Sequence, residues 1–146
     1  MIFQFKNIER KDWDILLEWR NNSLTKEMSI NSKSISKSDH YNYLKKIESN
    51  KHVNQFIFIH NNSYVGTIKV DNSDKKSTIL SYTINPDFRN KGYGKLMMYL
   101  FLFERNGVFL CEVKKTNFVS IKMCEWNTFK LKSKKGETLL YEKIIK

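Results

Sequence analysis

The chain of 146 residues carries a formal net charge of +11, with 26 Lys and Arg residues against 15 Asp and Glu residues. Its hydrophobic content of 40% and aromatic content of 14% are sufficient for a packed core and exclude a disordered chain. Because no linker rich in Gly, Ser or Pro divides it, we expect one domain over residues 1–146. No apolar run has the length of a membrane span, so the sequence predicts a cytoplasmic protein without one.

Periodicity and turn residues predict a strand, two helices, three strands, a helix, a strand, a helix and two strands. The expected ranges, in chain order, are a strand at 1–6, a helix at 12–21, a helix from 36 onward, strands at 55–60, 64–70 and 78–84, a helix at 95–105, a strand at 108–113, a helix at 117–126, and strands at 129–131 and 137–145. A hairpin turn is expected at Asn61-Asn62-Ser63. The helix at 95–105 places Leu96, Tyr99, Leu100 and Phe103 at helical spacing.

The most informative segment is Arg89-Asn90-Lys91-Gly92-Tyr93-Gly94, which joins an apolar strand to an amphipathic helix. Its two glycines allow a turn whose N–H groups converge beside a helix N-terminus, and such a turn favours a phosphate group. The chain has neither a P-loop nor the Gly-x-Gly-x-x-Gly pattern of dinucleotide-binding folds. A solvated connection that happens to contain two glycines is the alternative.

The positive charge favours an anionic partner, but it does not indicate nucleic acid. Only 4 of the 26 basic residues are Arg, and no ladder of Arg and aromatic residues is present. We therefore expect no nucleic-acid partner, with a basic nucleic-acid-binding domain as an alternative class. Cys111, Cys124 and the three His residues lack metal-ligand spacing, so no metal is expected.

Two segments resemble the GNAT superfamily of N-acetyltransferases. Residues 84–94, which contain the Arg-x-x-Gly-x-Gly pattern, are similar to that family's acetyl-CoA signature. Residues 117–129 resemble its Asn-x-x-Ala/Ser-Ile-x-Leu-Tyr-x-x-x-Gly-Phe segment. The resemblance implies an α+β GNAT fold, with a mixed, mostly antiparallel sheet of about seven strands and about four helices. It also implies acetyl-CoA as co-substrate and direct acetyl transfer without an acyl-enzyme.

The resemblance also assigns residues to acetyl-CoA. It implies a pyrophosphate loop made of Arg89, Asn90, Lys91, Gly92, Tyr93 and Gly94, which act mainly through their backbone N–H groups. It implies that the strands at 79–84 and 108–113 splay apart around the pantetheine arm, and that the N–H near Ile84 polarises the thioester carbonyl. Asn117 matches the position that bonds the arm, with capping of the last helix as an alternative.

The chain departs from the family at the acid and base positions. Cys124 stands where the family commonly carries the Tyr that protonates the CoA thiolate. A thiol could donate that proton, but a small core residue is the alternative we favour for Cys124. Glu112 is the candidate base, with a solvated Glu as its alternative.

The acceptor is predicted from Leu16-Leu17-Glu18-Trp19-Arg20-Asn21, which resembles a stretch of GNAT enzymes that acetylate 4-amino sugar nucleotides, such as those of pseudaminic acid pathways. The resemblance implies that Trp19, Arg20 and Asn21, with the loop at 22–35, border the acceptor site. A basic chain suits a nucleotide-linked sugar better than a cationic amine. The alternatives are a protein N-terminus as acceptor, a CoA-binding module without turnover, and Trp19 as a core anchor only; a homodimer is left open.

Overall fold

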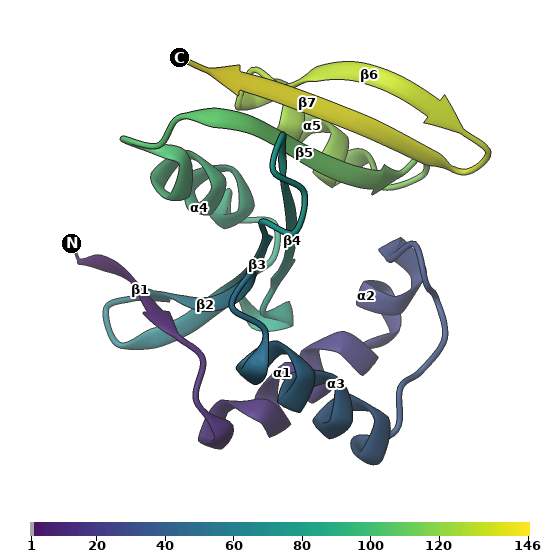
Figure 1. Ribbon diagram of the computed structural model, residues 1–146. Helices are drawn as coiled ribbons and strands as arrows, with labels where there is room; N and C mark the ends of the chain where they lie inside the picture. Colours follow the sequence, from purple (N-terminus) through teal and green to yellow (C-terminus); the bar gives the residue numbers. More distant parts are fainter. Residues whose placement is uncertain (1) are drawn as a thin grey trace.

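A seven-stranded sheet runs through the computed structural model, which describes residues 2–146 (Figure 1). The strands are β1 (Phe3–Asn7), β2 (Val53–His60), β3 (Ser63–Asp71), β4 (Thr78–Ile84), β5 (Gly107–Lys114), β6 (Lys130–Lys135) and β7 (Thr138–Ile145). Their spatial order is β1-β2-β3-β4-β5-β7-β6, and β4 with β5 is the parallel pair among antiparallel neighbours. The predicted mixed, mostly antiparallel sheet is confirmed.

The helices lie on both faces of the sheet (Figure 1). They are α1 (Trp13–Asn21), α2 (Ser23–Met28), α3 (Lys37–Ser49), α4 (Tyr93–Leu102) and α5 (Phe118–Trp126), with short 3₁₀ turns at Arg10–Asp12 and Pro86–Phe88. Four of them were expected, and the six-residue α2 lies in a segment predicted as loop. Its N-cap Asn22 accepts hydrogen bonds from the N–H groups of Leu24 and Thr25, which satisfies donors that a helix start leaves free.

Strand alternation divides the apolar side chains between the two faces. On β2, Phe58 packs with α4 and α5 in the larger core, while Ile57 and Ile59 pack against Leu16 and Trp19 of α1. This period of two is what a strand covered on both faces requires. The hairpin at Asn61 and Asn62 has φ angles of 48° and 69°, the left-handed pair that a two-residue turn needs.

A helix lies where one was expected at 95–105, but it begins and ends earlier, and of the four spaced apolar residues only Leu96 and Leu100 are half-buried. In α4 the buried side chains are Met97, Met98, Phe101 and Leu102. Tyr99 is 48% exposed, and Phe103, which lies beyond the last helical residue, is 61% exposed. The run is apolar nearly all round, so its periodicity alone could not identify the side that meets the sheet.

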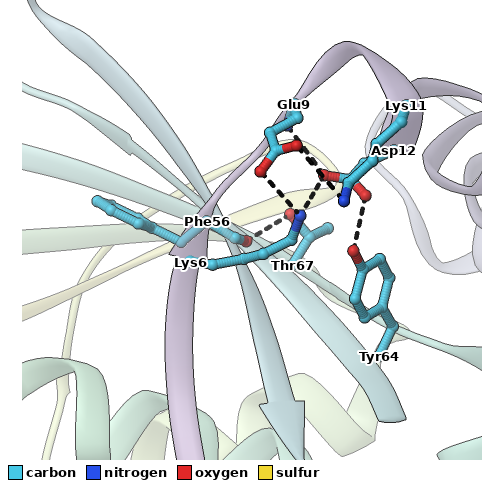
Figure 2. Close-up of polar contacts among 7 residues, drawn as sticks. All are labelled: Lys6, Glu9, Lys11, Asp12, Phe56, Tyr64 and Thr67. Atoms are coloured by element: carbon cyan, nitrogen blue, oxygen red, sulfur yellow. Dashed lines mark hydrogen bonds and ion pairs between the residues drawn. The ribbon is translucent and has the colours of Figure 1, made fainter. Parts of the chain in front are cut away.

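A buried carboxylate fixes the start of α1 against the sheet, as Figure 2 shows. Asp12, only 2% exposed, accepts hydrogen bonds at 2.8 Å from Lys6 Nζ of β1 and from Tyr64 Oη of β3. The Glu9 backbone N–H donates a third, at 2.9 Å. Burial alone would raise the pKa of Asp12, but these bonds outweigh it and lower that pKa below its ordinary value. The Asp12 carboxylate thereby joins β1, β3 and the 3₁₀ turn that precedes α1.

Candidate functional site

The parallel strands β4 and β5 separate at their carboxyl ends. Their pairing stops after Leu80 and Cys111, although β4 continues to Ile84 and β5 to Lys114. A cleft of about 620 Å³ lies at this separation and is lined from both strands. Backbone groups that face a gap between strands can bind an extended ligand as another strand would. The geometry therefore fits the arm of a long, narrow molecule.

The glycine-bearing loop borders the same cleft. Asn90 and Gly92 have φ angles of 61° and 81°, and α4 begins at Tyr93 without a side-chain cap. Within residues 2–146, the N–H groups of residues 91–95 donate no hydrogen bond to backbone or side chain. Left-handed turns followed by an uncapped helix start give converging free donors at the positive end of the helix dipole. This arrangement fits a pyrophosphate.

The side chains of the loop point in different directions. Lys91 is exposed, with Nζ 5.6 Å from the centroid of the Phe88 ring. Tyr93 Oη is hydrogen-bonded to His60 Nδ1 of β2 at 2.9 Å. A Cβ on Gly94 would lie 3.8 Å from side-chain atoms of Ile84 and Tyr82, so the helix start packs closely on β4. These contacts orient the loop and leave its backbone facing the cleft.

Arg89 reaches across the cleft mouth instead of into solvent. Its Nη1 donates to Asn22 Oδ1 at 3.0 Å, and its Nη2 is hydrogen-bonded to Thr25 Oγ1. Burial lowers the pKa of the guanidinium, and among the described residues no carboxylate forms an ion pair with it. The Arg89 side chain therefore connects the loop to α2 through hydrogen bonds.

The opposite wall holds α2 as well. Asn117 Oδ1 accepts from the Ser120 N–H and so caps α5, while its Nδ2 donates to the Met28 carbonyl at 3.4 Å. Lys114 Nζ donates to the Glu27 carbonyl at 2.9 Å. The last turn of α2 is thus bonded to β5 and to the start of α5. Helix α2 spans the mouth of the cleft between its two walls.

The structure brings most of the predicted site residues to the cleft wall. Those that line it are Arg20, Ile84, Arg89, Asn90, Gly92, Tyr93, Gly94, Glu112 and Asn117. The predicted residues that do not line it are Trp19, Asn21, Lys91 and Cys124. Trp19 is 3% exposed inside the α1 core, and Asn21 makes two hydrogen bonds with the Ile35 backbone that close the loop at 22–35.

Cys124 lies in the core. Its side chain is fully buried in the cluster between α4, α5 and the sheet, beside the thiol of Cys111. A hydrogen bond with Cys124 and burial both raise the pKa of the Cys111 thiol well above its ordinary value. The position of Cys124 agrees with a packing role.

A family model for acetyltransferases of the GNAT family matches residues 13–127. The chain belongs to the acetyltransferase (GNAT) family. It is accordingly an N-acetyltransferase with acetyl-CoA as its acetyl donor, and the cleft and loop described above fit that molecule. Within residues 2–146, no group of three or more His, Cys, Asp and Glu side chains could hold a metal ion. None of the helices there has the length and apolarity needed to cross a bilayer.

Solved structures share the fold of this acetyltransferase over nearly the whole chain. A domain from Methanocaldococcus jannaschii DSM 2661 is 20% identical, with a TM-score of 0.84 and 99% coverage of both chains. The Campylobacter jejuni N-acetyltransferase PseH in complex with acetyl coenzyme A is 18% identical, with a TM-score of 0.75 and coverage of 98% and 99%. The spermidine N-acetyltransferase from Vibrio cholerae in complex with CoA and spermine is 12% identical, with a TM-score of 0.81 and coverage of 98% and 95%. Curated proteins give no match.

The charge of the cleft wall in this acetyltransferase was not predicted residue by residue. Five cationic side chains line it, against the single carboxylate of Glu112: Arg20, Lys95, Arg89, Lys114 and Lys122. Three of them, Lys95, Lys114 and Lys122, were not predicted as site residues, because they lie in segments interpreted as helix, strand or solvated surface. Lysine is frequent throughout the chain, so no sequence signal separates the cleft lysines from the rest.

Proposed function

We propose that this acetyltransferase acetylates the amine of a small anionic acceptor, a nucleotide-linked amino sugar, by direct transfer from acetyl-CoA. The observation that carries the proposal is the cleft wall with five cations and one carboxylate. A lining of one sign raises the local concentration of oppositely charged ligands. The CoA phosphates account for the cations near the loop. Arg20 and Lys114 also line the cleft, and Lys114 Nζ uses one of its three N–H donors on the Glu27 carbonyl, so the others are available to an acceptor diphosphate.

The roles of the chain's own groups follow from their positions. The N–H groups of residues 91–95 would hold the pyrophosphate, with Gly92 supplying the left-handed turn. The separated ends of β4 and β5 would hold the arm, with Asn117 at the start of α5 beside it. A donor near Ile84 would stabilise the oxyanion that forms when the amine attacks, an effect typically worth about 3 kcal/mol.

Glu112 is the proposed base of this reaction. It is exposed on β5, lines the cleft and forms no ion pair with another described residue. Its carboxylate can take the amine proton directly or through a water molecule. We also propose that residues 1–146 form one GNAT domain that acts in the cytoplasm, where Cys111 and Cys124 stay reduced.

The competing acceptors differ in charge. The fold neighbour from Vibrio cholerae is a spermidine N-acetyltransferase, and a polyamine would meet five like charges in this cleft. A protein N-terminus is the remaining candidate among enzymes, because a peptide backbone could lie along the open mouth. The positive charge of the cleft therefore favours a nucleotide-linked amino sugar over a polyamine as the acceptor.

A panel of amine acceptors tests the proposal. CoA release, corrected for acetyl-CoA hydrolysis, would be measured with UDP- and dTDP-linked amino sugars, peptides with free N-termini, and polyamines. We expect turnover with nucleotide-linked amino sugars, and a higher KM for them in Lys114→Gln. The matched control is Lys115→Gln, since the neighbouring Lys115 pairs with Glu137 and does not line the cleft. Turnover on peptides or polyamines alone would reject the nucleotide sugar.

A further inference from the structure

Tyr82 is a hydroxyl-bearing side chain at the point where β4 leaves β5. It lies two residues past the last β4–β5 pair and lines the cleft. Its ring packs between the core and Gly94 at the start of α4, and Tyr82 Oη is hydrogen-bonded to Ser120 Oγ in the first turn of α5. The phenol is therefore held from two helices while its edge remains on the cleft wall.

One of the two hydroxyl hydrogens of Tyr82 and Ser120 takes part in no hydrogen bond within residues 2–146. Tyr82 and Ser120 contribute two O–H groups and share one hydrogen bond, and neither hydroxyl donates to a second acceptor among residues 2–146. When Ser120 donates to Tyr82, the phenol proton is free to point into the cleft. A free donor placed in this way is suited to a group on which negative charge develops.

The other candidate proton donors in this region are already engaged. Tyr93 also lines the cleft, but its hydroxyl is turned to His60 Nδ1 on β2, which lies two strands away from β4 in the sheet. The thiols of Cys111 and Cys124 are buried and lie against each other. Acetyl transfer from a thioester requires a proton for the departing sulfur, and Tyr82 is the aromatic hydroxyl on the wall that has one to give.

We propose that Tyr82, oriented by Ser120, donates the proton taken up by the CoA thiolate as it leaves. This role rests on the proposed acetyl transfer. The amine nitrogen forms its bond to the thioester carbon, the C–S bond breaks with its electron pair going to sulfur, and the sulfur takes the Tyr82 proton. The amine releases one proton to Glu112 or water, and the tyrosinate regains a proton from solvent, so the products are the amide and free CoA thiol.

The surroundings of Tyr82 keep its hydroxyl protonated before the reaction. Burial is the main cause of a pKa above the ordinary value for tyrosine, and it outweighs the opposing hydrogen bond from Ser120. The titratable groups that face it are Cys111 on β5 and Cys124 on α5, and both raise this pKa further. The phenol is thus a neutral donor throughout the physiological pH range.

This role is tested in the full chain by the single-turnover release of CoA thiol from acetyl-CoA, with a UDP- or dTDP-linked amino sugar as the acceptor. Tyr82→Phe removes the donor, so we expect a rate about 100-fold lower, with the rise in melting temperature caused by acetyl-CoA retained. Ser120→Ala should lower the rate about tenfold, and Ser120→Thr, which keeps the hydroxyl, should restore it. Tyr99→Phe, on the exposed side of α4, is the matched control and should match wild type.

A second measurement separates proton donation from packing. Replacing Tyr82 by 3,5-difluorotyrosine keeps the ring and the hydroxyl but makes the phenol more acidic. The alkaline fall of the single-turnover rate should then begin at a lower pH than in wild type, because the donor loses its proton earlier. A pH profile that superimposes on the wild-type profile, or a Tyr82→Phe rate within threefold of wild type, would overturn the role. A wild-type protein that binds acetyl-CoA but releases no thiol with any amine would instead overturn the proposed function.

Discussion

Arg89 Nη1 donates a hydrogen bond of 3.0 Å to Asn22 Oδ1, and this contact joins the proposed pyrophosphate loop to α2 at the cleft mouth. Asn22 uses the same oxygen to cap α2. The side chain of one proposed cofactor residue thus positions α2, which borders the proposed acceptor site. Binding of the donor and of the acceptor are expected to depend on each other through this link.

Replacing Arg89 by Lys should weaken that link. A lysine lacks the planar fork that reaches Asn22 and Thr25 together, so α2 loses one of its attachments. We expect kcat/KM for the acceptor to fall about tenfold, mainly through KM, as for the loss of a hydrogen bond worth about 1.4 kcal/mol. Steady-state kinetics with Arg105→Lys as control would check this, since Arg105 contacts Phe101 on the far side of α4. Equal kinetics for wild type and Arg89→Lys would show that the contact has no role.

Gly92→Ala tests the loop backbone. Gly92 has a φ of 81°, and a Cβ there would meet no atom within 4 Å, so the effect of Ala is conformational strain of about 1 kcal/mol. Because that strain distorts the N–H donors, the KM for acetyl-CoA should rise about tenfold. Gly136→Ala has the same open surroundings and a φ of 57°, but it lies in the β6–β7 turn. It should lower stability similarly and leave the KM unchanged; equal KM values for the two variants would contradict the assignment.

Asp12→Asn tests the network of Figure 2. The pKa of Asp12 lies below its ordinary value, so its contribution to the free energy of unfolding is present above about pH 5 and is lost as the pH falls through the folded value. Asp12 and Tyr64 raise the pKa of Lys6 against the effect of burial, so the Lys6 contribution is present below pH 10.5 and is lost at higher pH.

Urea unfolding at several pH values would measure that contribution. At pH 7 we expect Asp12→Asn to lower the free energy of unfolding by about 2 kcal/mol, and the difference from wild type to shrink below pH 4. Asp39→Asn, at an exposed carboxylate of α3, should change it by less than about 0.5 kcal/mol. A pH-independent difference for Asp12→Asn would contradict the charge-based explanation.

Cys124→Ala separates packing from proton transfer. The thiol is fully buried in the core, so its removal should leave a small cavity and lower the free energy of unfolding by about 1 kcal/mol. We expect kcat within twofold of wild type. Cys111→Ala removes the neighbouring buried thiol on β5 and should also lower the free energy of unfolding. A tenfold loss of kcat in Cys124→Ala with unchanged stability would instead indicate that the thiol takes part in the chemistry.

The order of the helices and strands along the chain and the place of the loop were predictable because both depend on local patterns. The alternation in β2 and the Asn61-Asn62 turn indicate a hairpin without any tertiary information. Helix α2 was missed because six residues are too few for an apolar repeat, although Asn22 carried a capping signal. Strand β6 is longer than predicted because it is an exposed edge strand, in which no inward alternation is required.

The functional side chains were less predictable than the backbone of the site. That Arg89 turns toward α2, and that Tyr82 meets Ser120, depends on contacts between segments 64 and 38 residues apart in the chain. No local pattern encodes such pairs. The inward position of Trp19 likewise follows from how α1 packs on β2, while its neighbour Arg20 reaches the cleft.

Thermal unfolding with acetyl-CoA and with acetyl-pantetheine tests the central claim most directly, since the second lacks the pyrophosphate. Acetyl-CoA should raise the melting temperature of the wild-type protein in a concentration-dependent way. Acetyl-pantetheine should raise it far less, and Gly92→Ala should reduce the difference between the two. No rise at saturating acetyl-CoA, or an equal rise with both ligands, would contradict a pyrophosphate site at residues 89–95.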